Sequence, residues 1–324
     1  MKQYIIPLVY LPLTSLAFAG PGDDPFEQQG FSGEISALIG YGSGKSNLAT
    51  DNAIKTGSLN SEADSESQLM PLPLGELSYT FGTQKVFFGM GRNDAVDAAL
   101  ELGYGFQLAN SSALMISYLH PVIDGEAWAD PYLVDTSREE TDVTTKGYRL
   151  QYLNMLGIGL DADFTHYQTE IENENSGSSY SSSSQSLLER DGSGIYASLS
   201  TGLPLSQSTF VMPSIHINQF SADGEAMSYT QYGFGLNLMH KFGEHSLLLG
   251  YEQATSNYDK ANPVFNQTQE DTISSISLGY NKEGFMGYQS LELRFMVGYD
   301  ETDSNIDFYN ESGYMIGVGT SYVF

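Results

Sequence analysis

The sequence predicts an all-β protein, a transmembrane antiparallel up-and-down β-barrel of about 14 strands, with 12 as the alternative number. Three observations predict this fold class: a secretory leader, repeated segments in which apolar and polar residues alternate, and an aromatic residue at the end of the chain. Alternation with period 2 produces a strand with one apolar face. A sheet in hydrocarbon must also close, because an open edge leaves backbone groups unsatisfied.

The first 19 residues have the features of a secretory signal peptide, which is removed and takes no part in the fold. Lys2 supplies a basic start, a largely apolar stretch follows, and residues 17–19 (Ala-Phe-Ala) place small side chains at the cleavage site. A retained membrane anchor is the alternative, but Pro7 and Pro12 suit it less well. We therefore expect a signal peptide at 1–19, a short periplasmic segment at 20–30 and the barrel at 31–324.

The last strand shows the alternation most clearly. Its apolar face holds Tyr314, Ile316, Val318, Thr320, Tyr322 and Phe324, and its other face holds Met315, Gly317, Gly319, Ser321 and Val323. The expected strands lie at 31–42, 74–82, 85–91, 99–108, 113–120, 146–154, 157–169, 193–202, 208–220, 228–240, 245–254, 272–281, 288–299 and 313–324. A soluble β-sandwich also alternates, but aromatic residues at the ends of the apolar faces favour membrane interfaces.

The connections alternate in length. Long ones lie near 43–73, 121–145, 170–192, 255–271 and 300–312, with shorter members of the same set near 92–98 and 221–227. Long extracellular loops and short periplasmic turns produce this alternation, and both termini are then periplasmic. Segment 208–220 is the weakest strand because Pro213 cannot donate to the ladder, and loss of its hairpin would give 12 strands.

The chain is strongly acidic, with 40 Asp and Glu against 13 Lys and Arg. So few cations disfavour nucleic acid as a partner. The five longest loops, with the third counted as 171–192, carry −2, −6, −3, −2 and −5 in chain order, together −18. Such loops either attract cations and bridge divalent ions to lipopolysaccharide phosphates, or are simply solvated. Cysteine is absent, which excludes disulfides and thiolate metal sites.

Strand parity alone assigns a set of charged and polar residues to the inner wall of the barrel. The lumen-lining candidates are Glu34, Glu76, Glu101, Arg149, Asp161, Asp163, His216, Glu252, Glu292 and Arg294. Carboxylates outnumber arginines, so a pore would prefer cations or neutral solutes. In a second, compatible interpretation, Arg149 and Arg294 pair with these carboxylates and brace the wall.

Loop 121–145 contains the only tryptophan of the chain. Trp128, Asp130 and Tyr132 are candidates for a pore-constricting loop, because the third loop of many porins folds inward. No porin loop motif matches here, so only the idea is carried over. An aromatic cluster that caps the loop outside the pore is the alternative.

Enzyme chemistry is disfavoured. Glu244, His245 and Ser246 are only sequence neighbours, and adjacent residues of a strand face opposite ways, so they do not form a triad. Residues 300–305 resemble a calcium loop but lack the EF-hand glycine and terminal glutamate. We expect no catalytic residues, no metal site and no cofactor.

Two resemblances add to this reading. The ending with Tyr322 and Phe324 resembles the assembly signal of bacterial outer-membrane barrels, which implies the barrel assembly machinery as a partner. Over most of its mature length, the chain also resembles an uncharacterised proteobacterial family, domain of unknown function 2860. Its resemblance implies an envelope location but no activity. It rests on residues 30–35, 73–75, 79–82, 130–132 and 138–142.

The sequence thus predicts an outer-membrane, porin-like channel for passive diffusion of small hydrophilic solutes or cations. Fourteen strands lie between small filled barrels and wide porins, so a narrow pore is expected. Outer-membrane lipid and lipopolysaccharide would be its surroundings. The alternative is a non-conducting surface barrel whose acidic loops bind ions, lipopolysaccharide or another cell.

Overall fold

The computed structural model describes residues 24–93, 96–122 and 124–324, so the expected signal peptide lies outside the described residues. In these residues one antiparallel sheet contains almost all of the regular structure. Its strands are β1 Gly30–Lys45, β2 Ser65–Phe81, β3 Gln84–Asn93, β4 Val96–Gln107, β5 Ala113–Pro121, β6 Gly125–Trp128, β7 Glu140–Leu153, β8 Leu160–Ile171, β9 Gly192–Thr201, β10 Leu203–Pro204, β11 Thr209–Ala222, β12 Tyr229–Phe242, β13 His245–Asn262, β14 Gln267–Lys282, β15 Leu291–Ser304 and β16 Glu311–Val323.

The helical segments are short: α1 Ser182–Gln185, η1 Ala109–Ser111, η2 Met155–Gly157, η3 Phe285–Gly287 and η4 Asp307–Tyr309. No helix in the described part of the chain is long and apolar enough to cross a membrane.

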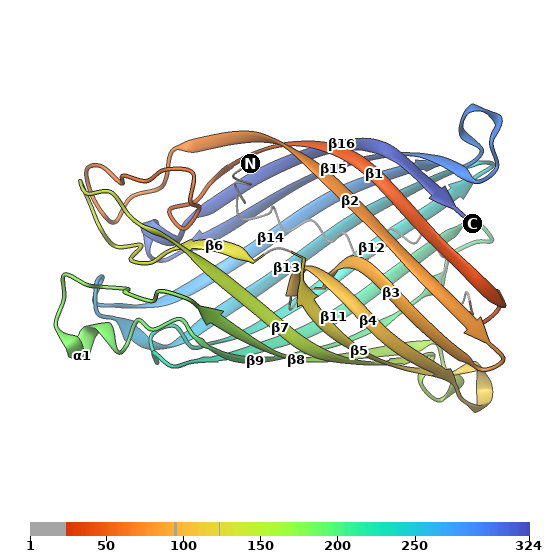
Figure 1. The fold of residues 1–324 in the computed structure, drawn as a ribbon, viewed down its shortest axis with the longest axis horizontal. Helices are drawn as coiled ribbons and strands as arrows, with labels where there is room; N and C mark the ends of the chain where they lie inside the picture. The colour runs from red at the N-terminus through yellow and green to blue at the C-terminus, as the bar shows by residue number, and fades with distance from the viewer. Residues whose placement is uncertain (1–23, 94–95, 123) are drawn as a thin grey trace.

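Fourteen of the sixteen strands form a closed ring (Figure 1). The two exceptions are short, and β6 adds to β7 while β10 adds to β11. Each strand of the ring pairs with its neighbours along the chain, and β1 pairs with β16 to close it. The backbone N–H of Gly33 donates to the Phe324 carbonyl over 2.9 Å, and the Phe324 N–H donates back over 3.0 Å. The predicted all-β closed barrel of 14 strands is therefore confirmed.

The outward residues of the strands form an exposed apolar belt. Ile39 is 65% exposed, Leu69 72% and Tyr148 66%. The same parity along the other strands exposes aromatic and branched side chains such as Phe88 and Tyr232. Such a continuous apolar surface is unfavourable in water and favourable in hydrocarbon.

On the inner face, large side chains lie against glycines of the neighbouring strand. A Cβ atom at Gly103 would overlap the ring of Phe87, and one at Gly194 would overlap the ring of Tyr167. These glycines therefore allow bulky rings to lie flat on the wall. Both rings are almost fully buried.

The strands extend further toward the loop end than the sequence predicts. The expected loops 43–73, 255–271 and 300–312 shrink to 46–64, 263–266 and 305–310. Alternating hydropathy marks only the part of a strand that crosses the apolar belt. In β13–β16 the residues beyond the belt are largely polar on both faces, so these paired strands continue without the pattern that predicted them.

Prolines lie where the ladder does not need a donor. Pro213 falls at the point where β11 exchanges its β9 partner for β10, because the β9 pairing begins at Ser214 and β10 pairs with Phe210 and Val211. Segment 209–222 is therefore a strand. Pro71 lies in the part of β2 that pairs with β1, while the pairing of β2 with β3 runs only from Gly75 to Phe81.

Candidate functional site

Arg294 organises the first charged cluster of the inner wall. Its Nη1 donates to Oε1 of Glu34 over 2.5 Å and its Nη2 donates to Oε2 of the same carboxylate over 2.8 Å. Nη2 also lies 3.0 Å from Glu292. Ser36 donates to Glu34 over 2.7 Å. The side chain of Arg294 is only 5% exposed, so two carboxylates compensate one buried cation.

Arg149 organises a second cluster on the inner wall with the same stoichiometry. Its Nε donates to Asp163 over 2.7 Å, and its Nη1 lies 3.3 Å from Glu101. Ser117 donates to Glu101 over 2.5 Å. The hypothesis that both arginines pair with inner-wall carboxylates therefore describes the observed contacts, and each cluster retains a formal charge of −1.

The remaining candidates lie apart from these clusters. His216 lies 3.8 Å from Glu252, and Glu76 lies 3.3 Å from Lys85. Asp161 accepts a 2.6 Å hydrogen bond from the backbone of Asn154, so its carboxylate serves the turn between β7 and β8. The ten predicted residues thus form two arginine clusters, two weaker pairs and one turn contact.

Sequence reasoning missed further charges with inward parity, among them Lys85, Asp271 and Asp300. Asp271 and Asp300 fell inside expected loops, but β14 and β15 extend through them. The alternation that continues through Gln269, Asp271 and Ile273 is the signal that could have found the first of them. Lys85 follows a tight turn, where parity is hard to assign.

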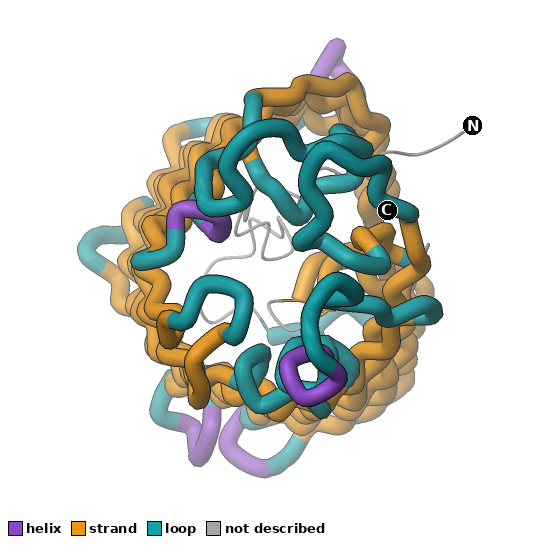
Figure 2. Tube along the Cα trace, turned by 90° about the vertical axis from the view of Figure 1, so that its left-hand side faces the viewer, coloured by secondary structure: helices purple, strands orange, loops and turns teal. Residues whose placement is uncertain are grey.

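The long loops pack together at the far end of the barrel through an apolar cluster, which we call the loop cap. Figure 2 views the barrel from this end and shows the loops folded inward from the rim. The hydroxyls of Tyr132 and Tyr309 lie 2.8 Å apart, and the Asn262 amide donates to Tyr309 over 2.9 Å. The cap consists of Leu59, Tyr132, Leu188, Met227, Val264, Phe265, Ile306, Phe308 and Tyr309.

Trp128 and Asp130 connect the loop after β6 to its neighbours. The Trp128 indole donates to the Ala49 carbonyl over 2.9 Å, and the Arg138 guanidinium lies 4.3 Å from its ring centroid. Asp130 accepts from the backbone N–H groups of Gly177 and Ser178. All three predicted loop residues thus make loop-to-loop contacts, and a constriction of the pore by them stays a prediction.

Burial shifts the pKa values of two charged side chains near the loop cap, Arg138 and Lys55. Burial lowers the pKa of Arg138 to about 10. Burial lowers the pKa of Lys55, and the positive charge of the nearby Arg138 lowers it further. The Lys55 ammonium donates to the Ser61 carbonyl over 2.8 Å.

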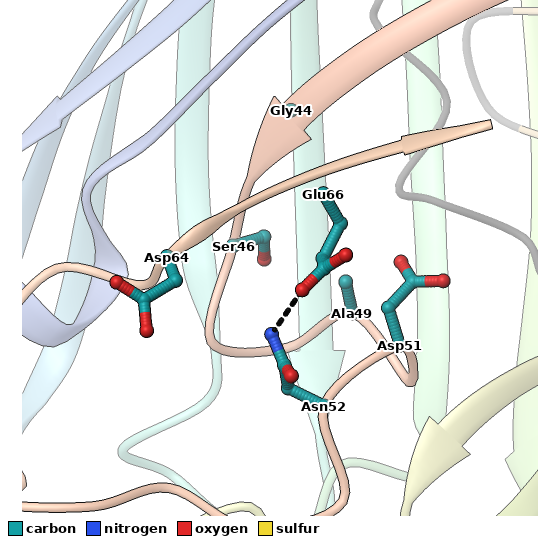
Figure 3. A pocket seen from close by; sticks show the side chains of 7 residues that line it. All are labelled: Gly44, Ser46, Ala49, Asp51, Asn52, Asp64 and Glu66. Atoms are coloured by element: carbon teal, nitrogen blue, oxygen red, sulfur yellow. Dashed lines mark hydrogen bonds between the residues drawn. The ribbon is translucent and has the colours of Figure 1, made fainter.

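A small pocket lies where the first loop leaves the wall. Figure 3 shows Asp51, Asp64 and Glu66 around it, with the Asn52 amide donating to Glu66 over 3.0 Å. Burial and the neighbouring Glu66 raise the pKa of Asp51. In the described residues, no group of three or more His, Cys, Asp or Glu side chains is arranged to hold a metal ion.

The segment before β1 enters the opposite end of the barrel. Phe26 is only 3% exposed and packs against Phe87, Ala113 and Met115. Gln29 donates to the Gly82 carbonyl over 3.0 Å and accepts from the Gly82 N–H over 2.8 Å. This segment, Asp24–Gln29, narrows that end of the lumen.

His245 and Ser246, which are neighbours in the sequence, do not come together as a catalytic pair. His245 accepts or donates a 2.7 Å hydrogen bond at the Tyr280 hydroxyl and stacks on Phe242, whereas Ser246 has the opposite parity and is buried. The two side chains therefore lie on opposite faces of β13.

Comparison with protein families gives one assignment. The family described as "Protein of unknown function (DUF2860)" matches residues 30–323, nearly the whole barrel. The chain belongs to this family. No curated protein matches the sequence.

Among solved structures, this family member is similar to three barrels. An outer-membrane channel from Pseudomonas putida F1 is 14% identical, with 94% of this chain and 99% of that chain covered and a TM-score of 0.46. The channel DcaP of Acinetobacter baumannii is 10% identical, with 91% and 98% covered and a TM-score of 0.44. The anion-selective porin of Comamonas acidovorans is 10% identical, with 91% and 98% covered and a TM-score of 0.42.

Proposed function

We propose that this protein is an outer-membrane channel for passive diffusion of small hydrophilic solutes, with cations preferred over anions. The observation that carries the proposal is the inner wall, where each of two arginines faces two carboxylates. An incoming cation would meet residual negative charge in both clusters, and an anion would be repelled. The closed ring and its apolar belt support a location in the outer membrane.

The surroundings follow from the same surfaces. Outer-membrane lipid would cover the belt, lipopolysaccharide would meet the acidic loops, and the barrel assembly machinery would recognise the ending with Tyr322 and Phe324. Both residues lie on the outer face of the β1–β16 pairing that closes the ring, which we call the seam. There Phe324 stacks on Phe31 with ring centroids 5.9 Å apart.

Single-channel recordings in planar bilayers test the proposal. We expect discrete current steps, and a reversal potential under a salt gradient that shows cation preference. Replacing an inner carboxylate by lysine should shift the reversal potential toward anions, so we predict this effect for Glu292→Lys and Glu101→Lys.

Glu301→Lys is the matched control. Glu301 lies on β15 like Glu292 but has outward parity and an exposed side chain. The same charge reversal at Glu301 should leave the selectivity nearly unchanged. Equal shifts for Glu292→Lys and Glu301→Lys would reject the assignment of these carboxylates to the ion path.

The loop cap favours a second function, a non-conducting surface barrel whose acidic loops bind ions, lipopolysaccharide or another cell. Nine apolar side chains hold the loops together over the rim. If purified protein gives no current steps, even after Tyr309→Ala and Phe308→Ala loosen the cap, the surface-barrel function replaces the channel.

A further inference from the structure

Two turns at the end of the barrel opposite the loop cap share one backbone shape. One contains η2, with residues Asn154, Met155, Leu156 and Gly157, and the other contains η3, with Gly284, Phe285, Met286 and Gly287. In both turns the first, third and fourth residues adopt positive φ angles. In both, the N–H of the fourth residue donates to the carbonyl of the first, over 2.8 Å and 3.1 Å.

The third position of each turn is costly for the residue that occupies it. Leu156 has φ 55° and Met286 has φ 54°, a left-handed conformation that is unfavourable for a residue with a Cβ atom. A related turn, η1, has left-handed residues only at its third and fourth positions, and both are polar, Asn110 and Ser111. A left-handed third position therefore does not require an apolar residue.

Contacts within the protein do not offset this cost. Leu156 is 68% exposed and Met286 is 76% exposed, the largest exposure among the large apolar residues of the described chain. The residues that follow each turn, Ile158 and Tyr288, are also 68% exposed. Exposed apolar side chains on a strained backbone gain free energy only if something apolar covers them.

The position of the turns indicates what covers them. Figures 1 and 2 both show η2 and η3 projecting sideways, beyond the outline of the barrel, rather than along its axis. They therefore extend the exposed apolar belt outward at its edge opposite the loop cap. No charged residue occurs in 154–159 or 284–290, whereas the loops at the other end are acidic. Lys282, with outward parity, lies two residues before Gly284.

We propose that these two turns are lipid anchors, which insert Leu156 and Met286 among the acyl chains and headgroups of the phospholipid leaflet at this end. Lys282 is placed to meet a lipid phosphate beside the second anchor. The anchors fix the height of the barrel in the bilayer and do not depend on whether the lumen conducts.

Single-cysteine labelling tests the anchors directly, because the chain contains no cysteine. Leu156→Cys and Met286→Cys are labelled with an environment-sensitive fluorophore in phosphatidylcholine vesicles. Thr83→Cys, in the exposed and non-apolar turn between β2 and β3, is the control. We expect labels at 156 and 286 to be quenched by nitroxide-bearing lipid and shielded from aqueous iodide, and the label at 83 to show the reverse.

Two outcomes would overturn the proposal. Iodide quenching at 156 and 286 as strong as at 83 would place the turns in water. Shielding from iodide without quenching by nitroxide lipid would mean that protein covers them, as in contacts between two copies of this chain.

A second pair of variants separates lipid contact from turn geometry. Asparagine tolerates left-handed backbone, so Leu156→Asn and Met286→Asn preserve the turn while removing the apolar side chain. If the residues only shaped the turn, the urea midpoint of unfolding from vesicles would stay the same or rise. We expect the midpoint to fall for both variants, and an unchanged or higher midpoint would contradict the anchors.

Discussion

The tyrosine pair in the loop cap shows how burial sets the chemistry of single side chains. Tyr132 and Tyr309 share a 2.8 Å hydrogen bond, and burial raises the pKa of both phenols above the ordinary value of 10.0. Ionisation is therefore disfavoured while the loops are packed together. When the cap opens, the same phenols ionise near pH 10.

The sign of the pH dependence follows from these shifts. A raised pKa in the packed state means that the cap has its full stability below pH 10 and loses it as the pH rises further. Because Trp128 is the sole tryptophan and lies buried beside the cap, its iodide quenching reports opening. We expect quenching to increase above about pH 10.

Two variants check the source of this transition. Tyr309→Phe removes one phenol from the cap and should move the transition to higher pH, whereas Tyr180→Phe changes an exposed loop tyrosine and should not. Arg138, which contacts Trp128, acts in the opposite direction, because burial lowers its pKa to about 10 and its loss of the proton favours the packed state as the pH rises. An unshifted transition in Tyr309→Phe would therefore contradict an origin in the tyrosine pair.

Where a strand crosses the apolar belt, parity groups the residues that lie on one face. The partners of Arg149 and Arg294 were among the candidates, because alternation identifies which side of a strand a residue occupies. The pairing itself was not predictable, since Glu34 lies 260 positions from Arg294 and only strand register brings them together. The position of Trp128 against Ala49 likewise depends on contacts between loops.

At the level of elements, the segment before β1 is held against the inner wall by several contacts at one end of the barrel. Asp24 accepts from the Gln107 side chain over 2.8 Å, which adds to the contacts of Phe26 and Gln29. The sequence indicated only a short segment here, because neither alternation nor charge marks a chain that folds back into its own barrel.

We expect Phe26→Ala to release this segment. The ring contributes most of its apolar contact with the wall, and a buried Phe→Ala change costs about 3–5 kcal/mol. The released segment should become susceptible to protease added on its side, and in a conducting barrel the unit conductance should rise. Phe31→Ala, on the outer face of β1, is the control. Unchanged proteolysis in Phe26→Ala would contradict this attachment of the segment to the wall.

Loop lengths were overestimated for a physical reason. Hydropathy reports contact with lipid, whereas a strand is defined by hydrogen bonds, and the two coincide only inside the belt. The hairpin of β13 and β14 shows the difference, because its pairing continues to Asn262 and Gln267 through largely polar sequence.

At the level of the whole molecule, the ring depends on its two ends meeting. The register between β1 and β16 runs from Glu34 with Val323 to Lys45 with Ser312, and the terminal Phe324 adds two backbone hydrogen bonds. Deletion of Phe324 should therefore lower the yield of folded barrel in vesicles, measured as the heat-modifiable band in cold electrophoresis. Deletion of Asp24 alone, which leaves the seam intact, is the control, and an equal loss in both would contradict a role for the seam.

The seam also limits when the barrel can close during synthesis and folding of the chain. Since β1 pairs with β16, this ladder cannot form until residues 312–323 have been synthesised. Pairings over such sequence separations form slowly. Until the ring closes, one strand edge and the apolar outer face are exposed, and both features favour aggregation of the unclosed chain.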